Sequence, residues 1–154
     1  LPNKTLYVIG SGPQLDNYKK LAKSNIKILG WTSDKNLIKY MQNAKAFIFP
    51  PLEDFGIIPV EAQSCGTPVI AFGKGGVMDT IVSYPNVKPT GIFFKKQNVN
   101  LLINSISKFE KNYKYFKPFY SRNNAKNFSK KKFFKKLNEY INQLIYLRYY
   151  KKYD

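Results

Sequence analysis

The sequence predicts an α/β fold with a doubly wound parallel sheet and helices on both of its faces. Two observations support this prediction. Short apolar runs rich in β-branched residues alternate with helical patterns at roughly 20-residue intervals, which is typical of successive strand–helix units. Glycine and proline follow most of these runs, so we expect the strands to end in loops that meet at one edge of the sheet.

The apolar runs are the expected strands. The third run, Ala46-Phe47-Ile48-Phe49, carries no polar side chain, as expected of a parallel strand buried on both faces, and two prolines end it. The expected strands span residues 5–9, 26–29, 46–49, 68–72 and 91–94.

Helical patterns fill the intervals between these strands. Residues 34–44 place Leu37, Ile38 and Met41 on one face, and Ser33 precedes them as the expected N-cap. The other expected helices run from the turn at Gly10–Pro13 to about residue 24, from Pro59 to near Cys65 with Gly66 as the stop, and from Gly76 through Val82.

Beyond Val99 the pattern is helical only. We therefore expect one domain, with a βα core over residues 1–95 and a helical part over residues 96–154. One helix is expected over Leu101–Phe109, and Ser129 caps a second helix that is apolar on one face and basic on the other. A membrane-surface helix has this pattern, but a terminal helix that packs on a core has it more often. The apolar positions are Phe133, Phe134, Leu137, Ile141, Leu144 and Ile145.

Composition excludes several kinds of chemistry. The chain has no histidine and one cysteine, Cys65, so it offers no Ser–His or Cys–His couple, no thiolate cluster and no intrachain disulfide. We expect no metal site. No apolar run approaches the roughly 20 residues of a spanning helix, and the N-terminus lacks a signal pattern, so a cytoplasmic location is expected.

The net charge of +17 calls for an anionic partner. Nucleic acid, an anionic membrane surface and phosphorylated ligands are all candidates, and a solvated lysine-rich surface is the simplest alternative. Arginine, which reads bases in bidentate fashion, is scarce in this chain. That scarcity argues against nucleic acid.

The strongest functional signal lies in the loop after the third expected strand. The chain has nine acidic residues, and three of them fall within residues 53–61. Glu53 stands in the loop and Glu61 in the expected first turn of the next helix, so both should face one cleft. Paired carboxylates accept hydrogen bonds from sugar hydroxyls, and Gly56 lets the backbone approach a ligand. The simpler alternatives are a surface charge at Glu53 and helix stabilisation at Glu61.

Two further loops are expected at the same edge of the sheet. Gly10-Ser11-Gly12-Pro13 begins like a dinucleotide-binding fingerprint, but Leu15 stands where the third glycine belongs. Amides that open a helix bind phosphate, although a tight strand-to-helix turn also explains the glycines. The other loop spans Phe72–Gly76.

Taken together, these motifs resemble the group 1 (family 4) glycosyltransferases, whose GT-B fold pairs two Rossmann-like domains. Glu53 and Glu61, with seven residues between them, match the paired-glutamate motif of that family. The resemblance covers nearly the whole chain and implies the C-terminal, Rossmann-like half of a GT-B fold. The other matching segments are Val8–Pro13, Ile28–Trp31, Ala46–Pro50, Glu61–Ile70, Gly75-Gly76, Thr90–Ile92 and Phe128-Ser129.

The resemblance also implies roles for individual residues. Glu53 would bind donor-sugar hydroxyls as the catalytic carboxylate, with Asp54 beside it, and Glu61 would bind the ribose hydroxyls. Backbone amides would contact the sugar and the β-phosphate, while the glycine turn and the end of the second strand would flank the nucleotide. The residues concerned are Phe55, Gly56 and Ile57 for sugar and phosphate, and Gly10, Ser11, Gly12, Leu29 and Trp31 for the nucleotide.

The implied activity is retaining transfer of a hexose from a GDP- or UDP-linked sugar to a glycan or glycolipid in bacterial-type cell-surface polysaccharide synthesis. Members of the family generally need no bound metal, and no other cofactor is expected. Many work at the cytosolic membrane face, which implies a peripheral position on an anionic membrane surface or a lipid-linked acceptor. The Glu-Asp-Phe-Gly variant with Phe72–Gly76 is similar to mannosyltransferase-like members, so GDP-mannose is the first donor to test.

The chain also departs from the family pattern. Asp54 replaces the usual glycine after the first glutamate, and Asp79 replaces the glutamate that follows the later glycine pair. The family places a diphosphate-gripping Arg and Lys on a strand and helix ahead of the strand that starts at Thr5, and neither is in this sequence. The N-terminal acceptor domain is missing as well. We therefore expect this chain alone not to catalyse transfer.

Two other functional classes stay open. A nucleotide-sugar epimerase of GT-B architecture would release a free epimer instead of a glycosylated acceptor. A non-enzymatic basic module would bind DNA or RNA with strong salt dependence. We expect no nucleic-acid partner, because the aromatic residues fall mostly in strand-like runs and no RNA-reading motif is present.

Overall fold

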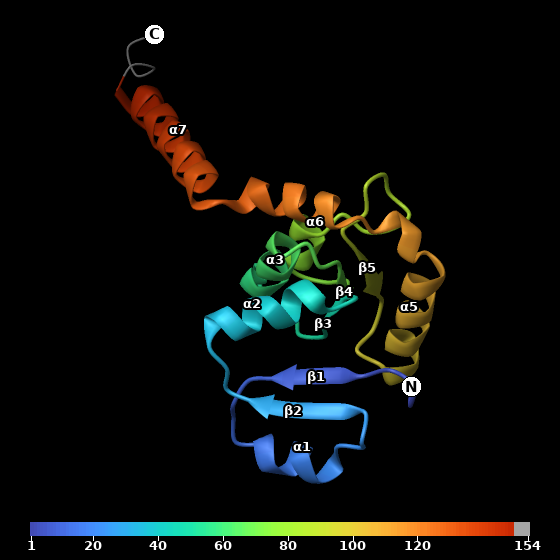
Figure 1. Ribbon diagram of the computed structural model, residues 1–154. Coiled ribbons are helices and arrows are strands. Elements are labelled where there is room, and N and C mark those ends of the chain that lie inside the picture. The colour runs from blue at the N-terminus through green and yellow to red at the C-terminus, as the bar shows by residue number, and fades with distance from the viewer. Residues whose placement is uncertain (150–154) are drawn as a thin grey trace.

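The chain folds as alternating strands and helices followed by helices alone, the order that the sequence predicts (Figure 1). A computed structural model describes residues 1–149 of the 154. The last five residues of the basic C-terminal segment, 150–154, lie outside the described part.

The strands form two parallel sheets. One pairs β1 (Leu6–Ile9) with β2 (Ile26–Gly30), and the other has the order β3-β4-β5. Each strand lies within one residue of its expected bounds at either end. The strands of the second sheet are β3 (Phe47–Phe49), β4 (Val69–Phe72) and β5 (Gly91–Phe94).

Helices connect the strands and then continue to the end of the described chain. The connecting helices are α1 (Leu15–Leu21), α2 (Asp34–Asn43), α3 (Ile57–Ser64) and α4 (Val77–Thr80). The later elements are α5 (Val99–Lys111), α6 (Pro118–Ala125), α7 (Lys130–Tyr149) and the short 3₁₀ turns η1 (Tyr113–Tyr115) and η2 (Lys126–Phe128).

The β3-β4-β5 sheet is covered by helices on both faces, as expected. Val69 and Ala71 of β4 pack in one cluster with Ala62 of α3, whereas Ile70 packs in a second cluster with Phe109 of α5. Alternate residues of a strand point to opposite faces, so α3 and α5 lie on opposite sides of this sheet.

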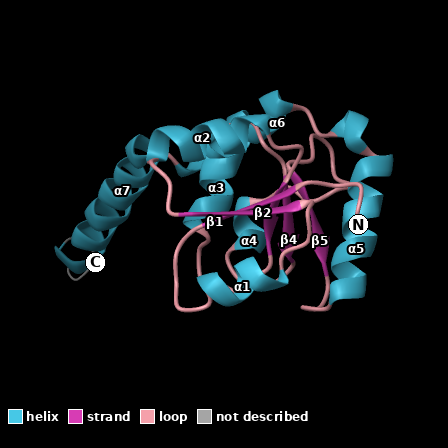
Figure 2. Ribbon diagram, turned by 60° about the horizontal axis from the view of Figure 1, so that its bottom comes forward, coloured by secondary structure: helices cyan, strands magenta, loops and turns pink. Residues whose placement is uncertain are grey.

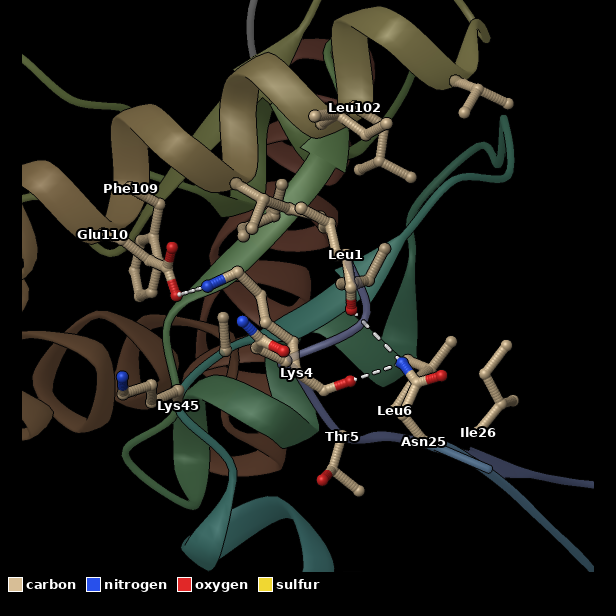
Figure 3. A pocket seen from close by; sticks show the side chains of 17 residues that line it. Leu1, Lys4, Thr5, Leu6, Asn25, Ile26, Lys45, Leu102, Phe109 and Glu110 are labelled. Carbon is tan, nitrogen blue, oxygen red and sulfur yellow. Dashed lines mark hydrogen bonds and ion pairs between the residues drawn. The ribbon is translucent and has the colours of Figure 1, made fainter. Parts of the chain in front are cut away.

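One feature of the predicted sheet needs correction. We expected a single sheet, but β1 and β3 are not paired, and residues from both strands line one cavity (Figure 3). Figures 1 and 2 show that β1 and β2 also run across the direction of the strands in the other sheet.

Several helices differ from their expected extent, and one was not predicted. α1 ends at Leu21 and not near residue 24, and α5 is two residues longer at each end than expected. α4 ends at Thr80 and not at Val82, because the Val82 amide donates to Thr90 Oγ1 at 3.0 Å and the Val82 carbonyl accepts from the Thr90 amide at 2.7 Å. These bonds draw the chain away from a helical path. α6 was not predicted, although Pro118 at its first position is a recognised start signal.

The last helix, α7, stands apart from the body of the molecule (Figure 1). None of its residues is buried, so the expectation that it packs on a core is wrong for this structure. Ser129 has an extended backbone that directs α7 away, and its Oγ accepts from the Lys132 amide at 3.5 Å, as expected of a cap. No helix within residues 1–149 is both long enough and apolar enough to cross a bilayer.

Candidate functional site

The strand ends of the second sheet bring two of the predicted loops into direct contact. The loop after β3 contains Glu53, and the loop after β4 contains Gly75 and Gly76. The Gly76 amide donates to the Glu53 carbonyl at 2.9 Å. The structure therefore holds the Glu53 loop against the start of α4.

Glycine is required at this contact. Gly75 has a φ of 77°, and a Cβ placed on it would lie 2.5 Å from the Glu53 carbonyl oxygen. A Cβ on Gly76 would overlap the backbone of Asp54 and Phe55. Any other residue would push the two loops apart, so the glycine pair fixes the position of the glutamate loop.

The side chains of this loop face solvent. Glu53 and Asp54 are exposed, and neither they nor Glu61 takes part in an ion pair among residues 1–149. Unpaired carboxylates at the end of a parallel strand are available to accept hydrogen bonds from a polyol ligand.

Gly56 starts α3 earlier than the sequence indicated. Its φ of 80° turns the chain so that the helix begins at Ile57, and Pro59 is accommodated within the first turn. Glu61 therefore lies in the second turn, and its predicted place in the first turn is wrong. The amides of Ile57 and Ile58, at the start of the helix, have no acceptor within it.

Phe55 connects the loop to the C-terminal helical part. Its ring meets the ring of Phe128 edge to face, with 5.9 Å between the ring centroids. Phe128, one of the residues that match the family pattern, therefore lies next to the loop that contains Glu53.

A buried polar network holds α3 in place. Gln63, which is fully buried, donates to the Thr80 carbonyl at 2.9 Å, and Asn124 of α6 donates to Gln63 Oε1 at 2.8 Å. Sequence reasoning missed both residues, because a single Gln or Asn carries no signal until the fold brings three helices together. Arg122 adds a bond to the Cys65 carbonyl at 3.2 Å.

The predicted nucleotide-binding residues other than Glu61, which lies on α3, are carried by the other sheet. Gly10, Ser11 and Gly12 follow β1 and are exposed, and Leu29 and Trp31 stand at the end of β2. Trp31 is 77% exposed, which leaves its ring available for stacking. Each of the two sheets therefore carries part of the predicted site.

A cavity lies away from this site. It has a volume of about 550 Å³ and lies between the starts of β1, β2 and β3 and the face of α5 (Figure 3). Exposed carboxylates at the strand ends carry the candidate chemistry, whereas this cavity has mostly apolar walls.

Sequence comparison gives the same family across most of the chain. The family model described as glycosyl transferases group 1 matches residues 1–133. A GDP-mannose-dependent monoacylated alpha-(1-6)-phosphatidylinositol monomannoside mannosyltransferase of Corynebacterium glutamicum is 33% identical over 91 residues, covering 52% of this chain and 24% of the relative. The alpha-1,3/1,6-mannosyltransferase ALG2 of Candida glabrata is 39% identical over 61 residues, covering 38% of this chain and 13% of the relative.

Solved structures share the fold. Sucrose-phosphate synthase from Thermosynechococcus elongatus superposes with a TM-score of 0.72 at 21% identity, covering 92% of this chain and 38% of that structure. HepE of Anabaena in complex with UDP-glucose gives a TM-score of 0.64 at 23% identity, covering 94% of this chain and 41% of that structure. The chain thus spans less than half the length of these relatives.

Proposed function

This chain belongs to the glycosyl transferases group 1 family, and we propose that it forms the donor-binding domain of a retaining glycosyltransferase. The enzyme transfers a hexose from a nucleotide sugar to a glycan or glycolipid acceptor in cell-surface polysaccharide synthesis. The observation that supports this most is the contact between the Glu53 loop and the Gly75-Gly76 loop, which presents unpaired carboxylates at the end of a parallel strand.

Each part of the site has a role in this proposal. Glu53 accepts hydrogen bonds from the donor sugar and stabilises the positive charge that develops at its anomeric carbon. The amides of residues 55–57 meet the sugar and the β-phosphate, since unsatisfied N–H groups at a helix start favour an anion. Glu61 receives the ribose hydroxyls. Trp31 and Leu29 flank the base, beside the turn at residues 10–12.

The identity of the donor sugar nucleotide is the most specific part of the proposal. GDP-mannose is favoured because a relative is named as GDP-mannose-dependent and others as mannosyltransferases. UDP-glucose is the alternative, because it is the ligand named for HepE, whose fold this chain shares. Both donors present a diphosphate and sugar hydroxyls to the same loop.

An acceptor domain and a membrane surface are the proposed partners. α7 carries six apolar side chains on one face, between 37% and 60% exposed, with lysines opposite them. In a helix of this kind the apolar side chains enter the membrane interface, and the lysines are attracted to anionic lipid head groups. That position would bring the enzyme to a lipid-linked acceptor.

Product analysis tests the proposal. A protein in which an N-terminal acceptor domain precedes this chain is incubated with labelled GDP-mannose or UDP-glucose and a lipid-linked acceptor, and the anomeric configuration of the product is read by NMR. We expect one donor to yield a glycosylated acceptor with retained configuration. Glu53→Gln should lower kcat/KM by about 100-fold or more, the range found when a group that stabilises transition-state charge is removed.

The control is Asp34→Asn, which makes the equivalent carboxylate-to-amide change at an exposed residue of α2. A free epimer in place of a glycosylated acceptor would establish the epimerase alternative. Inversion of configuration, or full activity in Glu53→Gln, would contradict the mechanism. The 154-residue chain alone should give no product.

A further inference from the structure

Three exposed lysines follow the second and third strands of the β3-β4-β5 sheet. Lys74 stands in the loop after β4, and Lys95 and Lys96 come directly after β5. Lysine and arginine make up 26 of the 154 residues, so about eight would be expected among residues 46–94, but that stretch has only Lys74 and Lys88. The three lysines therefore stand out beside a stretch that is poor in positive charge.

Backbone hydrogen bonding brings the two lysine-bearing loops together. The Gly73 amide donates to the Phe94 carbonyl at 3.0 Å, which extends the parallel ladder of β4 and β5 by one step and places Gly73 beside Lys95. Neighbouring strands of a sheet lie about 4.8 Å apart. Lys74 and Lys96, the next residues along the two loops, therefore leave the ladder at neighbouring positions.

Both of these loops are also tied to the loop that contains Glu53. The side-chain amide of Gln97, in the loop after β5, donates to the Pro50 carbonyl at 2.9 Å. The loop after β4 is held by the bond from the Gly76 amide to the Glu53 carbonyl. The three loops therefore form one surface at the carboxyl edge of the sheet, with carboxylates on the β3 loop and lysines on the other two.

Lys74, Lys95 and Lys96 are here called the lysine cluster. All three residues are exposed, and none takes part in an ion pair among residues 1–149, although carboxylates lie on the adjoining loop. Like charges at neighbouring positions of a sheet repel each other, and an anion bound between them offsets that repulsion. The cluster therefore favours a ligand that carries phosphate, which lysine ammonium groups bind as point charges.

The position of the cluster indicates which substrate brings the phosphate. β3 is the strand of its sheet nearest to β1, since residues of both strands line one cavity and no residue of β5 lines it (Figure 1). The predicted nucleotide-binding residues after β1 and β2 therefore lie on one side of Glu53, and the lysine cluster lies on the other. In a nucleotide sugar the diphosphate stands between the nucleoside and the sugar, so the donor diphosphate would lie on the side away from the lysines.

We propose that the lysine cluster binds a phosphate group of the acceptor. This inference rests on the proposed function, which puts the donor sugar at Glu53, and it adds a chemical property of the acceptor: a phosphodiester or diphosphate link close to the accepting sugar. A sugar carried on a lipid phosphate has such a link. The lysines hold the anionic link while the accepting sugar faces the donor sugar, which fixes the orientation in which the two sugars meet.

Amide chemical shifts measured by NMR test the proposal in the 154-residue chain. The chain is titrated with mannose joined to a butyl group through a phosphodiester, and with butyl mannoside, the uncharged counterpart. We expect the phosphodiester to bind at least about tenfold more tightly than the mannoside and to shift the amides of the lysine cluster. Its affinity should fall as the salt concentration rises, because the three lysines are exposed.

Two triple variants separate the lysine cluster from the general positive charge of the chain. Replacing all three lysines of the cluster by Gln should weaken phosphodiester binding on the order of tenfold. The matched control replaces three exposed lysines outside the candidate site by Gln and should change the affinity by less than about twofold. Its positions are Lys88, Lys111 and Lys117. When an acceptor domain precedes the chain, the cluster variant should raise KM for a phosphate-linked acceptor about tenfold and leave KM for the donor within about twofold.

Three outcomes decide the matter. Equal binding of the two probes, or unchanged phosphodiester binding in the cluster variant, would overturn the proposal. A cluster variant that loses GDP-mannose and UDP-glucose binding but keeps phosphodiester binding would also overturn it, since the lysines would then serve the donor diphosphate. If no donor binds or reacts while the phosphodiester still requires the three lysines, the proposed function fails and the phosphate site is supported.

Discussion

At the residue scale, the geometry of the candidate site depends on Gly75 and Gly76. Neither carries a functional group, yet they allow two loop backbones to touch, and the Gly76 amide bonds the Glu53 carbonyl. The sequence indicated the glutamates by their scarcity and spacing. The glycine pair could be recognised from the sequence, but its contact with Glu53 could not, because that contact joins the loops that follow two different strands.

Gly76→Ala should displace the Glu53 loop. The added methyl group would overlap the backbone of Asp54 and Phe55, which cannot move aside as a flexible side chain can. We expect a loss of about 2 kcal/mol in the free energy of unfolding, a fall of about 5 °C in Tm, and at least about tenfold weaker nucleotide-sugar binding. Thermal denaturation and titration calorimetry measure these changes.

Gly12→Ala is the matched control for stability. A Cβ at Gly12 would meet no heavy atom of residues 1–149 within 4 Å, so the Tm of the Gly12→Ala variant should stay within about 1 °C of the parent. Equal losses of stability in the two variants would contradict the specific role assigned to Gly76.

At the element scale, sequence periodicity located the strands well and the helix ends less well. The strands were readable because parallel strands buried on both faces are short continuous apolar runs. We expected α3 to begin at Pro59, because proline is common at the first position of a helix. The helix begins two residues earlier, at Ile57, and Gly56 in a left-handed conformation is its N-cap. α4 was predicted too long, because its end is set by hydrogen bonds to Thr90, ten residues further along the chain than Thr80.

None of the residues of α7 is buried against the rest of residues 1–149. Because α7 has an apolar face and several lysines, we expect the chain to sediment with vesicles that contain about 30% anionic lipid, and much less with neutral vesicles. The binding should weaken as the salt concentration rises. Replacing Lys131, Lys132, Lys135 and Lys136 by Gln should abolish most of this binding.

A chain that ends at Ser129 lacks α7 but keeps the lysines of the preceding residues. Comparing it with the full chain shows whether α7 itself contributes to vesicle binding. If the shortened chain binds anionic vesicles as well as the full chain does, the contribution of α7 is refuted. Equal binding to neutral and anionic vesicles would also refute it, and would favour α7 packing against protein.

At the scale of the whole molecule, the fold class and the family followed from the sequence, but the division into two sheets did not. Strand periodicity shows that strands exist and are parallel, whereas their order in space depends on which edges meet. The predicted sugar-binding residues and Glu61, the predicted ribose ligand, follow strands of the β3-β4-β5 sheet, whereas the other predicted nucleotide-binding residues follow strands of the β1-β2 sheet. The site is therefore assembled only when the relation between the sheets is fixed.

Nucleotide recognition at the strand ends is the central claim, and ligand-observed NMR tests it most directly. The 154-residue chain is mixed with GDP, UDP and ADP and their sugar conjugates, and the same spectra are recorded for Glu61→Ala. Glu61 is exposed and takes part in no ion pair among residues 1–149, so replacing its side chain should leave the fold intact. We predict saturation transfer to the nucleotide and sugar conjugate of one base, lost in the variant. Equal signals for all three bases that persist in Glu61→Ala would contradict the account.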